Sequence, residues 1–457
     1  LGAFFEHYIS KDVPHRSLLR DVYITVFEAY SPARRQQLFS ALVESLVESR
    51  SSLSAELKDS QLAYDFMAVF LENLGPLGRK LSQRLAHNRE LPSDLRRRFA
   101  QQQSQSEPFS VLGMWRRIEE AGSEIAALGI TSLDSLLGSA SMRQGHAAFG
   151  ELGPLAIKAM RPAIDKFLNE DSQAFEAAIS IFEKHGLHVP KYLLSEAKEV
   201  VSVEMDSTGE AVKLMKLSEQ YQNSNVLGYQ FATSRPLATG NRVIAESLAP
   251  GTPLDKRDTS SKAYDRSSRA IGLKLLRSIA CAETMHGDPH DGNVLEDQVA
   301  SQLTFVDCPL VFEVTPTLTK LAWHLFRRNA TETVNAVISC STNGNDLSAK
   351  DRKLLKGRVQ SIFSGKGSFE EKVNQISYEI LDFVMPTEGL RGLLNALGAG
   401  GHHLLRTVPK YKEIQDHGPS YFAAHMKELG KIAALAVISK AKSRLPLVSY
   451  GGPSRFR

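Results

Sequence analysis

The stretch from His286 to Asn293 places two imidazoles, two carboxylates and a carboxamide within eight residues, and a lone Asp307 follows the apolar run "LTFV". These residue types suit two kinds of site. Histidines and carboxylates can form a cage for a transition metal such as zinc. A carboxylate and an amide oxygen can instead hold magnesium beside a nucleotide phosphate. The two interpretations predict different surroundings in the rest of the chain.

A histidine-rich metal cage is disfavoured by the local sequence. His286 and His290 are four residues apart, a spacing that places two imidazoles on one face of a helix. Gly287 and Pro289 interrupt the segment, however, and a helix through it is not expected. A third histidine does not follow at a suitable spacing. A metal-dependent hydrolase is therefore retained only as a remote alternative.

The spacing of the polar residues favours nucleotide chemistry. Asp288 and Asn293 are five residues apart and His286 precedes them, as in the pattern H-R-D-x-x-x-x-N of kinase catalytic loops. Asp307 follows where that plan places a magnesium-binding aspartate. Phosphoryl transfer depends on positioning and charge neutralisation. We expect Asn293 and Asp307 to hold the metal and Asp288 to orient the nucleophile or accept its proton.

The upstream sequence supplies partners for such a loop. Lys158 lies in "PLAIK", a predicted strand that resembles the V-A-I-K pattern of a phosphate-binding lysine. Glu210 lies in a predicted helix, "MDSTGEAVKLMKLSEQYQ", and is the expected partner of that lysine. A loop that begins with Gly138, Ser139, Ala140 and Ser141 precedes the strand, where a phosphate-covering loop belongs. As an isolated residue, Lys158 could instead be an exposed lysine on an edge strand.

The predicted elements divide the chain into three parts. Residues 1–125 form a helical extension, residues 126–248 a small α+β lobe, and residues 249–457 a mostly helical lobe. A long helix over residues 260–287 leads into the His/Asp stretch, and "LTFVDCP" is a short buried strand. We expect a two-lobed fold with the polar residues of both lobes facing one cleft.

Several segments, taken in order, resemble the UbiB/ADCK family of atypical kinase-like ATPases. "HGDPHDGN" is similar to the HxDPHPGN loop of that family, and "LGPLGRKLSQRLAHNRELP" to its N-terminal KxGQ signature. "EMDSTGEA" resembles its ExD motif, "GSAS" its Ala-rich phosphate loop, and "RVIAESLAPGTPLD" its strand and hinge. The resemblance implies a protein-kinase-like α+β fold with ATP and magnesium as cofactors. The positions that it adds to the site are Lys80, Gln83, Glu204, Asp206 and Glu246, the last near the adenine.

The sequence also departs from this family pattern. Ser82 replaces the glycine of KxGQ, Asp291 replaces a proline, and Cys308-Pro309 replaces the Phe-Gly of DFG. Asp307 retains the metal carboxylate. We interpret His290 and Asp291 as turn-capping residues and Cys308 as a packed thiol. The departures indicate a divergent member with a divergent substrate.

The resemblance implies an atypical kinase-like ATPase or phosphotransferase. ATP hydrolysis coupled to a lipid or quinone-type small molecule and γ-phosphate transfer to a protein or small-molecule hydroxyl both remain open. The altered DFG motivates a third reading, a nucleotide-binding pseudokinase or scaffold. The substrate or acceptor is not specified by the residues.

Composition limits the partners and the compartment. The formal net charge of +4 is spread along 457 residues, which gives no concentrated basic face for nucleic acid. Three cysteines without CxxC spacing favour a reducing compartment, either the cytoplasm or an organelle matrix reached through a removed targeting segment. The apolar run near Ile432 is shorter than the roughly 18 residues that a membrane span needs, so we expect no span but allow peripheral membrane contact.

Overall fold

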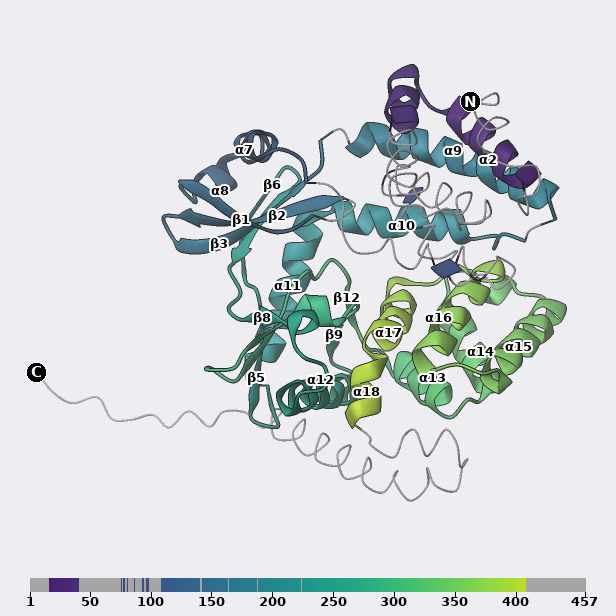
Figure 1. Cartoon of the computed structure of the whole chain (residues 1–457). Coiled ribbons are helices and arrows are strands. Elements are labelled where there is room, and N and C mark those ends of the chain that lie inside the picture. The colour runs from purple at the N-terminus through teal and green to yellow at the C-terminus, as the bar shows by residue number, and fades with distance from the viewer. Residues whose placement is uncertain are drawn as a thin grey trace, which may run out of the picture.

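The computed structural model describes residues 16–40, 75, 77–78, 80, 86, 93, 96–97, 108–139, 142–162, 164–186, 188–222 and 224–407. Figure 1 shows a small β-rich lobe above strand- and helix-containing elements of a larger lobe, with a group of helices beside the small lobe. Three predicted site residues, Gln83, Ala140 and Ser141, lie outside the described residues, as does much of the helical extension predicted over residues 1–125.

The small lobe is built on an antiparallel sheet with strand order β1-β2-β3-β7-β6. Its strands are β1 (Ser132–Ser139), β2 (Arg143–Gly150), β3 (Gly153–Met160), β6 (Pro236–Gly240) and β7 (Val243–Ser247). Two short helices, α7 (Val111–Glu119) and α8 (Ser123–Ala126), share an apolar core with one face of this sheet. Leu155, Ile157 and Ala159 of β3 are buried in that core. The residues between them therefore face the other side of the sheet.

That other side is occupied by α11 (Ser207–Tyr221), which packs against β6 and β7. The Asp206 carboxylate caps this helix by accepting a hydrogen bond from the Gly209 N–H at 2.8 Å. Such a cap satisfies one of the free N–H groups of the first turn. The predicted helix over residues 205–222 is thereby confirmed.

Three helices form a separate apolar cluster beside the small lobe. They are α2 (Arg16–Ala29), α9 (Ile164–Lys184) and α10 (Leu193–Met205). Figure 1 shows α2 lying along α9, with α10 closer to the larger lobe. Gly186 follows α9 with a φ of +74°, a backbone conformation that favours glycine, and it ends the helix as the sequence predicts.

Short strands connect the small lobe to the larger one. A second sheet has the order β4-β5-β11-β10-β8, and its strands are β4 (Asn225–Val226), β5 (Tyr229–Thr233), β8 (Thr252–Pro253), β10 (Val294–Asp297) and β11 (Gln302–Phe305). Its central strands β5 and β11 are parallel, and β10 and β11 form an antiparallel hairpin. The buried strand predicted at "LTFVDCP" corresponds to β11.

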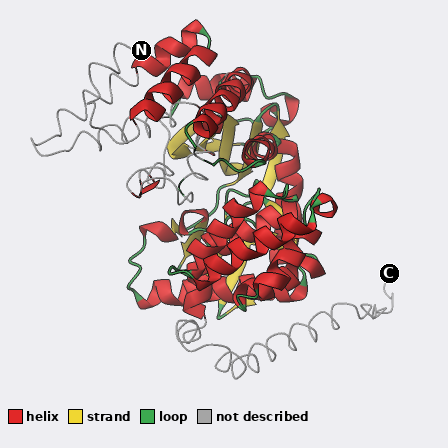
Figure 2. Cartoon of the chain, turned by 90° about the vertical axis from the view of Figure 1, so that its right-hand side faces the viewer, coloured by secondary structure: helices red, strands yellow, loops and turns green. Residues whose placement is uncertain are grey.

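The larger lobe is otherwise helical among the described residues. Figure 2 shows its helices gathered below the sheet of the small lobe. They are α12 (Lys262–Cys281), α13 (Pro316–Phe326), α14 (Ala330–Ser339), α15 (Ala349–Ser364), α16 (Phe369–Glu379), α17 (Glu388–Ala399) and α18 (Gly401–Thr407). Their apolar faces share one large core with β5, β10 and β11.

One sequence expectation about the larger lobe is wrong. The helix expected over residues 260–287 ends at Cys281, because Ala282 adopts a left-handed conformation with a φ of +54°. The chain then forms β9 (Thr284–His286), which pairs with β12 (Val311–Glu313). A two-stranded antiparallel sheet, rather than a helix, therefore positions the polar stretch.

This architecture is the expected mixed α+β, protein-kinase-like fold with N-terminal helices. The chain passes between the lobes after β7 and reaches β8 through a turn in which Gly251 has a φ of +106°. A Cβ at Gly251 would lie 2.6 Å from the backbone of Glu296, so the turn requires glycine. Among the described residues, no helix combines the length and apolarity needed to cross a bilayer.

Candidate nucleotide and magnesium site

Lys158 lies on a central strand and faces the cleft. It pairs with Gly145 of β2 and Ile244 of β7, so β3 has neighbours on both sides and the edge-strand alternative is excluded. Its Nζ lies 3.0 Å from the Glu246 Oε1, 3.7 Å from the Asp307 Oδ1 and 3.9 Å from the Glu210 Oε1. The lysine thus joins carboxylates from both lobes.

The charge of Lys158 is maintained by these carboxylates. Burial disfavours the ammonium form, but the negative charges of Glu246 and Asp307 outweigh it, so the pKa of Lys158 is raised above its usual value. The lysine is therefore a permanent cation at neutral pH. A permanent cation in this position suits a phosphate ligand.

Glu246, which the family resemblance puts near the adenine, is also close to Lys158. It lies diagonally across from Lys158 on the paired strands β3 and β7 and is almost fully buried. Its carboxylate also accepts a hydrogen bond from the Ser234 Oγ at 2.6 Å. The Glu246 side chain is therefore a partner of the lysine, and the residues that follow β7 form the hinge.

Glu210 approaches Lys158 from α11, as predicted, but it has a second and closer cationic partner. The guanidinium of Arg143 forms an ion pair with the other Glu210 oxygen and donates a hydrogen bond to the Glu204 carbonyl oxygen. Arg143 is the first residue of β2, directly after the phosphate-loop segment. Its position on the strand that pairs with β3 is the sequence signal that could have assigned it to the site.

The N-terminal signature contributes one described residue to this charge network. The Lys80 Nζ lies 2.6 Å from the Glu204 Oε1 at the end of α10. Asp206, the other acidic residue of the ExD motif, caps α11 and so supports the helix that carries Glu210. Lys80 is therefore linked to Arg143 through Glu204.

Gly138 and Ser139 are the last two residues of β1, which pairs with β2. Gly138 pairs with Gly145, and the Ser139 Oγ accepts a hydrogen bond from the Arg161 Nη2 at 2.7 Å. A Cβ at Gly138 would meet no atom within 4 Å, so this glycine is not required by packing.

His286 holds the polar loop to the segment before Asp307. Its Nδ1 accepts a hydrogen bond from the Asp288 N–H at 3.0 Å, and its Nε2 donates to the Val306 carbonyl oxygen at 3.2 Å. These bonds require a neutral imidazole with its proton on Nε2. Burial is the main cause of the lowered pKa of His286 and is consistent with that state.

Asn293 and Asp307 are brought together by the β10–β11 hairpin. Asn293 immediately precedes β10, Asp307 follows β11 by two residues, and the Val306 N–H donates to the Asn293 carbonyl oxygen at 3.0 Å. The Asn293 Nδ2 donates to the Asp288 carbonyl oxygen at 3.1 Å. The amide nitrogen is thereby engaged by the loop, so a cation bound here would be held through the amide oxygen.

Asp307 combines an unusual backbone with an ionised side chain. Its φ is +57°, a left-handed conformation that aspartate tolerates better than most residues. Desolvation within the cleft opposes ionisation, but the charges of Lys158 and Arg143 outweigh it and lower the pKa of Asp307. The side chain remains about half exposed, at 52%. It is therefore both ionised and accessible to a ligand.

The structure agrees in part with the sequence interpretations of Cys308, His290 and Asp291. Cys308 is fully buried, and burial raises the pKa of its thiol, as expected for a packed cysteine. The His290 Nδ1 accepts a hydrogen bond from the Gly292 N–H at 3.1 Å and so caps the loop. Asp291 is not a simple cap, because its carboxylate contacts Tyr264, His402 and His403. The last two lie on α18, and sequence spacing could not associate them with Asp291.

The donor set of the cleft fits magnesium and a nucleotide phosphate. Asp307 and Asn293 offer oxygen atoms, which Mg²⁺ prefers over nitrogen or sulfur. Ion pairs among the described residues here join four carboxylates (Glu204, Glu210, Glu246 and Asp307) to three cations (Lys80, Arg143 and Lys158). A divalent cation would offset this excess of negative charge.

Comparison with known proteins agrees with this geometry. Residues 125–340 match the model of the ABC1 atypical kinase-like domain, so this part of the chain is similar to such domains. The chicken AarF domain-containing protein kinase 1 is 26% identical over 39% of this chain and 35% of its own length. An uncharacterised Synechocystis protein is 24% identical over 68% of this chain and 55% of its own.

The chain thus spans between about a third and about half of the length of these relatives. Among solved structures, the complex of Rv3197 with erythromycin from Mycobacterium tuberculosis has a TM-score of 0.43 and 16% sequence identity. That similarity covers 82% of this chain and 95% of the other.

Proposed function

We propose that the cleft binds ATP with magnesium and either hydrolyses it or transfers its γ-phosphate. The observation that carries the proposal is the 3.7 Å separation between the Lys158 Nζ of the small lobe and the Asp307 Oδ1 of the large lobe. A phosphate-binding cation and a metal-binding carboxylate thereby meet at one point between the lobes. The similarity of residues 125–340 to the ABC1 atypical kinase-like domain supports the same assignment.

The residues of the cleft have distinct roles in this proposal. Lys158 contacts the α- and β-phosphates. Glu246 and Glu210 position the lysine, and Arg143 in turn positions Glu210. Asn293 and Asp307 hold magnesium, which when bound neutralises the charge that develops on the transferred phosphoryl group. The Asp288 side chain is half exposed and belongs to the loop held by His286. It orients the attacking water or hydroxyl or accepts its proton.

The acceptor is proposed only as a chemical class. Lys80 contacts Glu204, and the family resemblance implies that this KxGQ-like lysine enters the nucleotide site and restricts access by a protein substrate. This contact supports hydrolysis coupled to a lipid or quinone-type small molecule, as the family resemblance implies. Peripheral contact with a membrane is compatible with such a ligand. The three cysteines are free thiols, which supports a reducing compartment, cytoplasm or organelle matrix.

A second candidate function is a nucleotide-binding pseudokinase. The observation that favours it is the ion pair between Arg143 and Glu210, which holds one oxygen of the lysine's partner away from Lys158. The Cys308-Pro309 replacement also removes the Phe-Gly that follows the aspartate in related loops. This alternative predicts nucleotide binding without turnover.

Magnesium-dependent ATP turnover distinguishes the two candidates. Replacing either aspartate in Asp288→Asn and Asp307→Asn, or the lysine in Lys158→Met, should lower turnover by about 100- to 1,000-fold, because each removes a charge that the transition state needs. Exposed residues of the same types provide the matched controls Asp258→Asn and Lys198→Met, which should retain wild-type turnover.

Thermal shift with ATP, measured in parallel, completes the test. Turnover that is lost in the site variants but kept in the controls supports the ATPase or kinase. Stabilisation by ATP without turnover in the wild type would support the pseudokinase. A folded protein with neither binding nor turnover would overturn both.

A further inference from the structure

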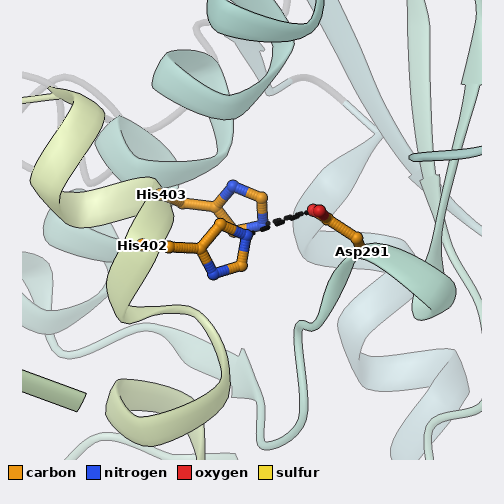
Figure 3. Close-up of side chains that lie close together, drawn as sticks. All are labelled: Asp291, His402 and His403. Atoms are coloured by element: carbon orange, nitrogen blue, oxygen red, sulfur yellow. Dashed lines mark hydrogen bonds and ion pairs between the residues drawn. The ribbon is translucent and has the colours of Figure 1, made fainter. Parts of the chain in front are cut away.

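Asp291 contacts two adjacent histidines that belong to a different element. It lies in the loop between Asp288 and Asn293, at the position where the family pattern has a proline. His402 and His403 lie on α18, which packs against α12. Figure 3 shows both imidazoles directed toward the Asp291 carboxylate from one side.

The spacing of these three side chains fits a metal site. The Nε2 atoms of His402 and His403 lie 3.2 Å and 3.3 Å from the Asp291 Oδ1, and a ligand atom from each of the three residues lies within 4.8 Å of the others. Zinc binds nitrogen and carboxylate oxygen at about 2.0–2.1 Å, which makes the edges of its tetrahedron about 3.3 Å. The two N···O distances match that edge.

A buried nitrogen without a hydrogen bond supplies a second observation. His403 is fully buried, and among the described residues its Nε2 forms no hydrogen bond of acceptable geometry, although the Asp291 carboxylate is close and the Pro289 backbone interacts with the ring. A buried polar atom left unpaired in this way is costly and calls for a ligand. An ion seated between Nε2 and the carboxylate would satisfy both.

Two neighbouring hydroxyl groups contact these side chains, as the groups that orient metal ligands usually do. The Ser268 Oγ lies 2.8 Å from the His403 Nδ1, and the Tyr264 hydroxyl donates to the Asp291 Oδ2 at 2.5 Å. If the His403 Nδ1 donates to the Ser268 hydroxyl, the Nε2 lone pair is directed to the metal, as in other metal sites whose histidines are oriented by an outer hydrogen bond.

We propose that Asp291, His402 and His403 form a site for a divalent transition metal of the zinc class, with water as the fourth ligand. The inference goes beyond the proposed ATP site and does not depend on it, because it uses different residues. It rests on nitrogen-containing ligands, which suit zinc rather than magnesium. The metal joins α18 to the loop that carries Asp288 and Asn293, and it would hold that loop in place.

Metal binding by the full chain, freed of metal with a chelator, tests the proposal. Addition of Co²⁺ as a spectroscopic substitute should give the visible absorption of a tetrahedral site at one equivalent, and Zn²⁺ should displace it. His402→Ala is the decisive variant, because His402 is 38% exposed and its loss should leave the fold intact. We expect at least a tenfold loss of affinity in His402→Ala, Asp291→Asn and His403→Gln.

Two further variants separate this site from other ones. His188→Ala removes a histidine that also pairs with an aspartate, Asp382, at 2.6 Å, and it should bind Co²⁺ as the wild type does. Asp307→Asn alters the proposed magnesium site and should also leave Co²⁺ binding unchanged. Failure of the folded wild type to bind, or equal binding by His402→Ala, would show that the three side chains form only a hydrogen-bonded cluster. Neither outcome depends on ATP turnover.

Discussion

At the scale of single residues, the cleft depends on charges that are held by their neighbours. Lys158 is a permanent cation because Glu246 and Asp307 outweigh the cost of its burial. Asp307 remains ionised because Lys158 and Arg143 offset its desolvation. Each group thus maintains the charged state of the other, and loss of one should alter both the charge and the geometry of the site.

His286 leads to a prediction about pH at this scale. It is buried, its Nδ1 must accept and its Nε2 must donate, so the folded state disfavours its protonation and its pKa lies below 6.5. The unfolded chain binds a proton at this histidine as the pH falls through about 6.5. The free energy of unfolding should therefore be highest above that pH and decrease below it, by up to about 1.4 kcal/mol per pH unit for this proton.

Urea unfolding between pH 8 and pH 5 measures that slope. His286→Gln should be less stable at pH 8 but should have a shallower dependence on pH than the wild type. Equal slopes for wild type and His286→Gln would contradict a neutral, buried His286.

The residue types of the site could be predicted from spacing, but their pairings could not. The positions of Lys158, Glu210, Asn293 and Asp307 in the motifs were enough to place all four at the cleft. The partners Arg143 and Ser234 depend on strand register and on a tertiary contact. Such contacts join residues 67 and 12 positions apart, and local patterns carry no information about them.

At the scale of elements, a buried ion pair joins α10 to α17. The Arg391 Nε and Nη2 lie 2.8 Å and 2.9 Å from the two oxygens of Glu196, and both side chains are nearly fully buried. Such a two-pronged pair fixes the orientation of one helix against the other. It also links a helix beside the small lobe to the helical lobe.

Removal of one residue of this ion pair should lower the free energy of unfolding much more than removal of both residues. Arg391→Leu leaves the Glu196 carboxylate buried without its main partner, and it should lower the free energy of unfolding by about 3–5 kcal/mol. The double variant Glu196→Leu/Arg391→Leu should recover most of that loss. Denaturant unfolding of the two single variants and the double variant measures the coupling. Additive losses would mean that the pair does not stabilise the contact between α10 and α17.

Elements with strong periodicity could be predicted, and short ones could not. The β3 strand and the α11 helix were evident from their sequence patterns. The strand β9 was taken for the end of a helix, because its three residues are too few for an alternating pattern. The turn at Ala282 that separates it from α12 uses a left-handed backbone that alanine rarely adopts.

At the scale of the whole molecule, the two lobes present complementary parts of one site. The small lobe supplies the lysine and its positioning residues, and the large lobe supplies the loop and the metal carboxylate. The two are connected by the hinge after β7 and by the Lys158–Asp307 contact. We therefore expect nucleotide and magnesium to bind together and to strengthen the contact between the lobes.

The most direct test is calorimetric titration of the full chain with ATP in the presence and absence of magnesium. We expect one ATP per chain, bound at least tenfold more weakly without magnesium, because Asn293 and Asp307 engage the nucleotide through the metal. Asp307→Asn should bind ATP weakly under both conditions, and Asp258→Asn should match the wild type. ATP affinity that is independent of both magnesium and Asp307, or no binding by the folded protein, would contradict the account.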